Sequence, residues 1–392
     1  MHWVCHTAPI LVFLTIMSPL STALRTRVAV IGASVSGSSF IREILRSGSV
    51  DVTVLERASR PGGRCSTRII DDLARFDHGA TYVKAKSKQF EVVLDELEKK
   101  GHVEKWVMNG ATYDCNSNEY QAKPAATVRI GTKGMSSIVE GMLASSPSVD
   151  IQFRYGIEVI DAMREERVWR IKDRDGKLED GLVFDWIVCA DRGLSEKLRG
   201  EVVEPEDLFL PSLAVMVTFD AKTSEMLAAS LDCQTLFVQN SKELAYVCEN
   251  SAKPGRQGAS ALSKQMVLQS TADYAQELIS EVRAKVDPED ERAILEAVRR
   301  DSEKPLLDAF AKVVGGISGS DTVNLEHTFI QGHRWSRSFP NPAKTVANGR
   351  CLVDADIGLI SVGDYFAECY PGKVEGAALS GAAGAVELLR QI

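Results

Sequence analysis

A short strand-like run that leads straight into a glycine-rich turn constrains the fold of this chain more than any other feature. The run Arg27–Ile31 (RVAVI) is apolar and rich in β-branched residues, and the turn Gly32–Gly37 (GASVSG) follows it directly. Beyond the turn comes a predicted helix with four apolar residues on one face: Phe40, Ile41, Ile44 and Leu45. A second apolar run, Val50–Leu55, then ends at Glu56. This order of elements predicts a βαβ unit of the kind that binds dinucleotides.

Each position in this unit has a chemical reason. Gly32 permits the tight turn, and Gly37 lets the helix pack on the strand, so that the helix N-terminus faces a pyrophosphate. Ser34 stands where such units usually carry a middle glycine, and serine is the smallest polar side chain that could fit there. Glu56 is placed to accept hydrogen bonds from the hydroxyls of an adenosine ribose. We expect these four residues to hold a nucleotide.

Length and composition fit a folded chain of two domains. The 392 residues exceed the usual size of one domain, and 44% hydrophobic with 26% charged residues is ordinary for a globular protein. The formal net charge of -8 leaves no basic stripe that could displace the counterions of a phosphate backbone. We therefore expect no nucleic-acid partner.

The first 23 residues differ from the rest of the chain. Ile10–Leu20 is an apolar run too short to span a bilayer, and the small residues Ser21 and Ala23 follow it. This pattern predicts a cleavable signal or targeting peptide over residues 1–23, with no stable membrane span after its removal. The protein would then enter the secretory pathway or an organelle such as a plastid. A buried first element of the fold is the alternative.

A second glycine-rich loop, Arg57–Arg64, favours FAD over NAD as the nucleotide. Here the sequence resembles the flavin amine oxidase superfamily, because Gly62, Gly63 and Arg64 match its G-G-R loop. The resemblance implies that Gly63 and Arg64 reach the pyrophosphate and the flavin. Phe76–Tyr82 (FDHGATY) is similar to the D-x-G-A-x-Y segment that passes near the isoalloxazine ring in that superfamily.

The resemblance extends along most of the chain and is narrower than the superfamily. Gly131–Met135, Ser251–Arg256 and His333–Trp335 resemble segments of renalase-like flavoproteins. The resemblance implies one strand over 151–160 whose backbone at Ile157 touches adenine. Near the C-terminus, Gly363 and Asp364 match the pair that approaches the ribityl-phosphate part of FAD.

Val374–Ala377 (VEGA) resembles the family's last flavin contact, made by backbone at a helix N-terminus. Val374 and Gly376 would lie beside the flavin carbonyl region, and Gly376 would permit a close approach. A positive helix end there would stabilise the anionic reduced flavin. The neighbours of Cys369 do not match the covalent-flavin motif of monoamine oxidases, so we expect FAD to be bound noncovalently.

The resemblance also implies the fold class and its domains. We expect an α/β protein in which an FAD/NAD(P)-binding Rossmann-like domain carries an inserted α+β substrate domain, as in amine oxidases and renalases. The FAD-binding domain would comprise residues 24–84, 125–200 and 320–392. The substrate domain would comprise residues 85–124 and 201–319.

Flavin chemistry needs few catalytic side chains, because the cofactor itself accepts the hydride. No metal-ligand cluster and no nucleophile-His-Asp pattern stands out, so we expect no metal and assign no catalytic residue. His78 and His333 are candidates only because each lies in a segment that the resemblance places near the flavin.

Substrate contacts are expected from Tyr82, Trp335, Tyr370 and Lys373. Lys373 stands where amine oxidases usually carry an aromatic residue, and a lysine there would repel a cationic amine and suit an anion. Lys253 and Arg256 could also meet an anion, unless they belong to a solvated surface loop.

These features favour a renalase-like oxidoreductase. It would pass a hydride from a small or nucleotide substrate, such as isomeric reduced NAD(P), to FAD, with molecular oxygen as the acceptor and hydrogen peroxide as the product. An amine or polyamine oxidase is one alternative. A protein that binds flavin or nucleotide without turnover is another.

Overall fold

The computed structural model describes residues 25–46, 50–70, 74–144, 151–174, 176, 178–201, 204–256, 263–320 and 323–392. The expected leader over residues 1–23 lies outside these ranges. Among the described residues, no helix is both long and apolar enough to cross a membrane.

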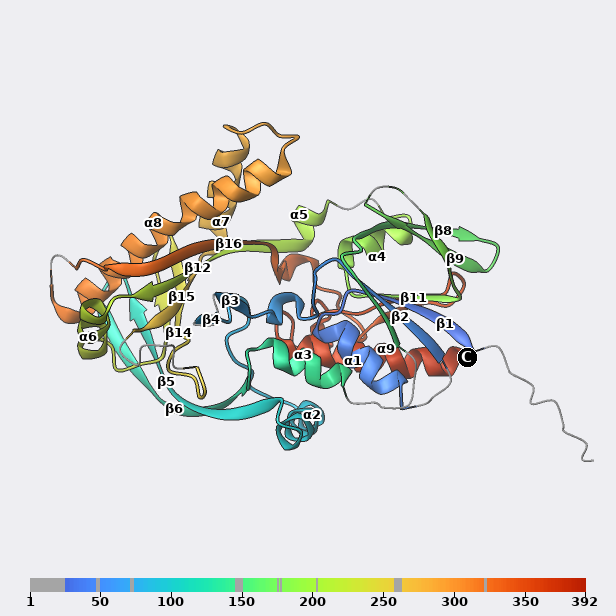
Figure 1. The fold of residues 1–392 in the computed structure, drawn as a ribbon, viewed down its shortest axis with the longest axis horizontal. Coiled ribbons are helices and arrows are strands. Elements are labelled where there is room, and N and C mark those ends of the chain that lie inside the picture. The colour runs from blue at the N-terminus through green and yellow to red at the C-terminus, as the bar shows by residue number, and fades with distance from the viewer. Residues whose placement is uncertain are drawn as a thin grey trace, which may run out of the picture.

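One half of the molecule is built on a six-stranded sheet with the strand order β17-β18-β11-β1-β2-β7 (Figure 1). Its strands are β1 (Thr26–Ile31), β2 (Val50–Glu56), β7 (Ile151–Tyr155), β11 (Trp186–Cys189), β17 (Leu352–Asp354) and β18 (Leu359–Ser361). All run parallel except β17, which is antiparallel to β18. Both faces are covered, which explains why the strands read as continuous apolar runs.

Helices α1 (Val35–Ile44), α3 (Ser136–Leu143) and α9 (Val374–Gln391) lie together on one side of this sheet. Phe40, Ile44 and Leu388 from α1 and α9 bury their side chains against Val28 and Val30 of β1. The opposite face packs against a three-stranded antiparallel sheet and α4 (Arg192–Leu198). That smaller sheet consists of β8 (Val159–Glu165), β9 (Val168–Asp173) and β10 (Leu178–Phe184).

The other half is built on a seven-stranded mixed sheet with the order β16-β12-β15-β14-β13-β5-β6. The strands are β5 (Val103–Asp114), β6 (Glu119–Gly131), β12 (Phe209–Phe219), β13 (Thr235–Gln239), β14 (Leu244–Glu249), β15 (Gln265–Ser270) and β16 (His327–Pro340). Helices α6 (Ala221–Ser230), α7 (Ala272–Arg283) and α8 (Glu291–Ser318) cover one face and share a large apolar core with it. Two further helices, α2 (Lys88–Lys99) and α5 (Pro205–Leu208), complete the described α-helices.

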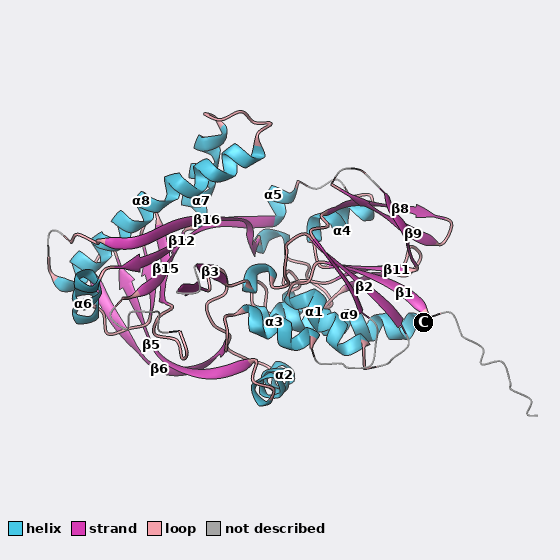
Figure 2. Ribbon diagram, viewed as in Figure 1, coloured by secondary structure: helices cyan, strands magenta, loops and turns pink. Residues whose placement is uncertain are grey.

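The hairpin of β3 (Arg68–Ile70) and β4 (Ala74–Phe76) lies between the two halves (Figure 2). Phe76 at its end packs on Ala214 and Met216 of β12, so the hairpin rests on the seven-stranded sheet. The strand β16 runs from the helical end of that sheet toward the parallel-sheet half. These two elements bring the sheets to a common boundary.

Two features of the strands differ from the sequence expectations, and one helix, α8, ends in a common C-terminal cap. The single strand expected over 151–160 is broken at Gly156, whose φ of 76° is a left-handed conformation that ends β7 before β8 begins. The strand β16 and the end of β6 belong to the seven-stranded sheet, although they fall in segments expected for the FAD-binding domain. The helix α8 continues to Ser318 and ends at Gly319 in the left-handed conformation.

Candidate functional site

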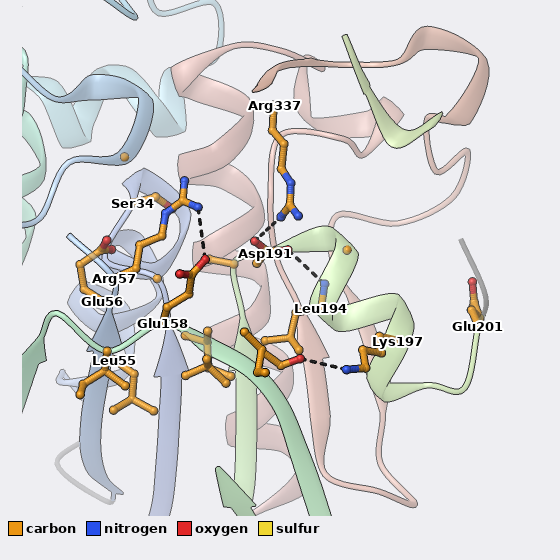
Figure 3. Close-up of a pocket in the computed structure, with 18 residues that line it drawn as sticks. Ser34, Leu55, Glu56, Arg57, Glu158, Asp191, Leu194, Lys197, Glu201 and Arg337 are labelled. Atoms are coloured by element: carbon orange, nitrogen blue, oxygen red, sulfur yellow. Dashed lines mark hydrogen bonds and ion pairs between the residues drawn. The ribbon is translucent and has the colours of Figure 1, made fainter. Parts of the chain in front are cut away.

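A cavity of about 570 Å³ lies at the carboxyl ends of β1, β2 and β11 (Figure 3). Ligands of open parallel sheets bind at this edge, because the loops that follow the strands meet there. The cavity is lined by five of the residues expected to hold a cofactor: Gly32, Ser34, Glu56, Gly63 and Ile157. The structure thus brings residues from three separate segments to one place.

The turn between β1 and α1 depends on two glycines. Gly32 has a φ of 96°, which favours glycine, and an added Cβ at Gly37 would lie 2.1 Å from the Gly32 carbonyl oxygen. Among the described residues, no side chain caps α1, and the hydroxyl of its N-cap, Ser34, lies 3.2 Å from that of Ser36. The first-turn N–H groups therefore keep the partial positive charge of a helix N-terminus, which suits a phosphate.

The serine in place of the middle glycine fits because a neighbouring loop makes room for it. Gly63 has a φ of 54°, and an added Cβ there would lie 2.9 Å from the Cβ of Ser34. Gly62 donates its N–H to the carbonyl of Ala33 at 3.0 Å, so the second loop is joined to the first turn. The two glycine-rich loops therefore form one surface, and Ser34 uses space that Gly63 leaves open.

Glu56 is buried at the end of β2. Its carboxylate accepts the N–H of Ala33 at 2.7 Å and the N–H of Ala58 at 2.8 Å, which fixes the side chain beside the turn. Each carboxylate oxygen has further acceptor capacity that a ribose hydroxyl could use. The N–H of Ile157 donates to the backbone carbonyl of Glu56 at 3.1 Å, so Ile157 lies beside this acid through backbone contact.

Sequence reasoning missed polar residues on the far side of the cavity. Asp191 follows β11 and caps α4 by accepting the N–H of Leu194 at 3.0 Å. Arg337 of β16 forms an ion pair with Asp191 at 2.5 Å, and both line the cavity. The position of Asp191 directly after an apolar strand was a usable signal, because all parallel strands end at the same edge. No sequence pattern pointed to Arg337.

Arg64 and Asp364 join the N-terminal and C-terminal motifs. The Arg64 guanidinium donates to both carboxylate oxygens of Asp364 at 2.8 and 2.7 Å, and also to the Ser338 carbonyl at 2.8 Å. Burial lowers the pKa of Arg64, but the charge and hydrogen bonds of Asp364 outweigh burial, and the pKa is raised. Both residues were expected to contact the cofactor, and the structure shows them paired with each other.

The C-terminal motif is organised by packing. An added Cβ at Gly376 would lie 2.1 Å from the carbonyl oxygen of Cys369, so glycine is required there by the preceding loop. Gly363 donates its N–H to the Ser380 hydroxyl at 2.9 Å. Glu375, which we had given no role, is buried and accepts the N–H groups of Lys86 and Ser87 at the start of α2. Val374, Gly376, Gly363 and Asp364 do not line the cavity described above.

The rings of two histidines and a tryptophan pack together where the hairpin meets β16. The ring of His78 lies 4.5 Å from that of His333 and 5.0 Å from that of Trp335, measured between centroids. Trp335 donates its indole N–H to the His78 carbonyl at 3.0 Å. Burial, followed by the charge of Arg68, lowers the pKa of His78 to about 4. Burial and His78 lower the pKa of His333 to about 2, so both rings are neutral near pH 7.

The expected substrate residues occupy two places. Tyr82 and Tyr370 are half-buried against one apolar cluster, whereas Trp335 packs against another beside the hairpin. Lys373 is exposed at the N-cap of α9. A different lysine approaches an aromatic residue: the Nζ of Lys86 lies 5.5 Å from the centre of the Tyr370 ring.

The positions of Lys253 and Arg256 correct the sequence expectation. Both side chains are fully buried and both pair with Asp77, Lys253 through a contact of 2.8 Å. Neither faces an anionic substrate or lies on a solvated loop. Asp77 also accepts the Thr67 hydroxyl at 2.7 Å and the Met135 N–H at 2.8 Å. These residues therefore join three motif segments into one buried structural hub.

Comparisons with known proteins agree with this geometry. A family profile described as an NAD(P)-binding Rossmann-like domain matches residues 30–97. A structure described as a protoporphyrinogen oxidase from Exiguobacterium sp. 255-15 is similar, with a TM-score of 0.66 and 11% identity over 94% of this chain and 99% of that one. The chain shares that fold. The expected α/β class with a Rossmann-like domain is confirmed.

Two other solved structures show the same similarity. Putrescine oxidase bound to putrescine matches with a TM-score of 0.59 and 11% identity, over 94% of this chain and 99% of that one. An oxidoreductase from Methanosarcina mazei matches with a TM-score of 0.61 and 12% identity, over 93% of this chain and all of that one. The described fold therefore extends over nearly the full length of these proteins.

Proposed function

We propose that this protein is an FAD-dependent oxidoreductase. The observation that carries the proposal is that two adjacent residues connect the nucleotide cavity to the C-terminal motif. Gly63 lines the cavity, and Arg64 is hydrogen-bonded to Asp364 of that motif. A dinucleotide that begins at the β1–α1 turn and extends past the second glycine loop would arrive at this ion pair. The fold shared with oxidase structures supports the same assignment.

The residues present fit FAD. Glu56 would hold the adenosine ribose, the N-terminus of α1 would face the pyrophosphate, and Arg64 with Asp364 would lie beside the ribityl-phosphate part. The bound flavin would supply the hydride acceptor. The chain itself would bind and orient the reactants and exclude water. The closely packed rings of His78, His333 and Trp335 would help to exclude water. We propose that the flavin is held noncovalently, so that acid precipitation should release it.

The charge near Tyr370 favours a substrate that is not a cationic amine. Lys86 already lies over the Tyr370 ring, and Lys373 is exposed close by in sequence. Two ammonium groups would repel an amine. We therefore propose the renalase-like reaction: a hydride passes from a small or nucleotide substrate, such as isomeric reduced NAD(P), to FAD. Oxygen then takes up two electrons and two protons to give hydrogen peroxide.

Anaerobic reduction of the purified holoprotein tests this function. Isomeric reduced nicotinamides should bleach the visible absorbance of the oxidised flavin, and readmitted oxygen should restore it with formation of peroxide. Bleaching by putrescine or other amines alone would instead show an amine oxidase. Bound FAD that none of these compounds reduces would show a binding protein without turnover.

A further inference from the structure

Three arginines, here called the arginine cluster, lie on the elements that meet at β16: Arg68 on the hairpin, Arg299 on α8, and Arg334 on the face of β16 that α8 covers. Arg68 lies on β3 and pairs directly with Phe76 of β4, and Phe76 precedes His78 by two residues. Arg334 lies on β16 between His333 and Trp335. The helix α8 passes so close that an added Cβ at Gly332 would lie 2.1 Å from the Arg299 carbonyl oxygen. Elements that are remote in sequence thus bring positive charge to one place.

Among the described residues, two of these arginines have no hydrogen-bond acceptor. Within the described part of the chain, no carboxylate, hydroxyl or carbonyl group bonds the guanidinium of Arg68 or Arg299, and the Nε of Arg299 is buried without a partner. Burial and then the charge of Arg68 lower the pKa of Arg299, and Arg334 acts in the same direction. The buried Nε of Arg299 is costly to leave without an acceptor, and both side chains are only partly buried, so their guanidinium groups could donate to a bound anion.

The acids near the cluster are used elsewhere. Asp77 is shared by Lys253 and Arg256, and Glu303 accepts the N–H of Gly332 at 2.9 Å. Glu296 is mostly exposed and pairs with Arg292 at 3.1 Å. Glu291 approaches Arg334 at 3.9 Å but also pairs with Arg283. None of these carboxylates satisfies Arg68 or Arg299.

The histidines add an open polar atom beside the cluster. The Nδ1 of His333 is buried and has no hydrogen-bond partner among the described residues. Because His333 is neutral, one of its ring nitrogens can donate to a bound acceptor without placing a further charge beside the arginines. The same ring contacts Trp335, and a Cβ added at Gly79 would lie 3.3 Å from Trp335 and 2.1 Å from the Arg64 carbonyl. Trp335 and Gly79 therefore lie between His333, beside the cluster, and Arg64 of the second glycine loop.

We propose that the arginine cluster binds an oxyanion group of the substrate, a phosphate or a carboxylate, while the reacting part of the substrate extends past Trp335 toward Arg64. Guanidinium groups suit such anions because they donate paired hydrogen bonds in a plane. This inference deepens the proposed function and rests on it for the position of the reacting ring. It assigns the substrate anion to Arg68 and Arg299 in place of Lys253 and Arg256.

Titration of the holoprotein with inorganic phosphate, and separately with glutarate, tests the proposal by calorimetry and by the change in flavin absorbance. We expect the wild type to bind at least one of them, and Arg68→Gln and Arg299→Gln each to weaken that binding about tenfold or more, because each removes a charged donor. The matched control is Arg300→Gln, one residue along the same helix, since Arg300 is exposed and pairs with Asp301. Its affinity should equal that of the wild type.

The two anions separate the possible sources. Tighter binding of phosphate indicates a phosphorylated or nucleotide substrate, and tighter binding of glutarate indicates a carboxylate substrate. Absence of binding by the wild type, or equal affinity in the wild type, Arg68→Gln and Arg299→Gln, would overturn the inference. If Arg299→Gln does not fold, the anion affinity of Arg68→Gln relative to the wild type decides whether the inference stands.

Calorimetry does not need a bound flavin. Failure of FAD uptake would therefore defeat the proposed function and still leave the cluster measurable. A holoprotein that substrate reduces, but whose anion affinity ignores both substitutions, would defeat this inference alone.

Discussion

Arg64 and Asp364, which are 300 residues apart in the chain, form an ion pair with two hydrogen bonds of 2.8 and 2.7 Å. Asp364 is almost fully buried, and Arg64 is partly exposed. The pair fixes the second glycine loop against the strand-to-loop junction that follows β18. It therefore ties the two expected parts of the cofactor site together.

Asp364→Asn should weaken both folding and FAD binding. It removes a charged partner from a partly buried arginine, so we expect the free energy of unfolding to fall by about 1–3 kcal/mol. The control is Asp185→Asn, which breaks the comparable pair of Arg27 with Asp185 at the start of β11, away from the cavity. The free energy of unfolding, measured in urea, and the flavin occupancy should both drop in Asp364→Asn, whereas only the free energy of unfolding should drop in the control. Equal occupancy in the two variants would contradict a role for this pair at the cofactor.

Gly37→Ala should abolish or strongly reduce FAD binding. The new Cβ would lie 2.1 Å from the Gly32 carbonyl oxygen, so α1 must move away from the turn that shapes the cavity. Ser38→Ala is the matched control on the same helix, because the buried Ser38 hydroxyl has no hydrogen-bond partner in the part of the chain that the structure describes. Flavin absorbance per chain, measured after dialysis against FAD, checks both variants. Full occupancy in Gly37→Ala would show that the turn does not shape the site.

Asp77 should contribute stability that disappears in acid. Burial alone would raise its pKa, but the charges of Lys253 and Arg256 outweigh burial and lower it from 3.8 to about 2. A carboxyl whose pKa is lower in the folded state stabilises the protein above its unfolded pKa, and that contribution is lost as the pH falls from 3.8 toward 2. It amounts to about 2 kcal/mol by linkage.

Asp77→Asn tests this hub. It also leaves Lys253 and Arg256 buried without a carboxylate, so at pH 7 we expect a loss of about 3–5 kcal/mol in urea unfolding. The stability difference from the wild type should shrink below about pH 4, as the wild-type carboxyl takes up its proton. A difference that does not change with pH would mean that the charge of Asp77 is irrelevant.

His78 should make the protein less stable in mild acid. Its pKa is lowered from 6.5 to about 4, first by burial and then by Arg68, because the folded state disfavours the charged ring. Stability is therefore full above 6.5 and falls as the pH drops toward 4, by roughly 3 kcal/mol. In urea unfolding, His78→Gln should remove the His78 part of this slope, whereas His333, whose pKa burial also lowers, should keep its own part. His327→Gln, at the exposed start of β16, should keep the full slope.

The βαβ unit could be predicted from sequence because its signals are local. The expected strands over 27–31 and 50–55 correspond to β1 and β2 within one residue at each end, and the four apolar residues expected on one helical face are all buried. Hydrophobic periodicity and glycine position act within a few residues, so neighbouring sequence determines them.

Long-range electrostatics could not be predicted in the same way. The burial of Lys253 and Arg256 depends on Asp77, about 180 residues earlier, and nothing in the local sequence distinguishes a buried pair from a solvated loop. Likewise, Arg337 reaches the cavity only because β16 extends from one sheet to the other. Such contacts are set by topology, and the local sequence around these residues carries no signal for them.

The most direct measurement of the central claim is the uptake of FAD by the purified protein, followed by visible absorbance and by calorimetry. We predict noncovalent binding of one FAD per chain, with markedly weaker binding when Glu56, whose carboxylate is fixed by the N–H groups of Ala33 and Ala58, is replaced by alanine. A folded, colourless protein that takes up no FAD, or one that binds FAD equally well after Glu56→Ala, would contradict the account.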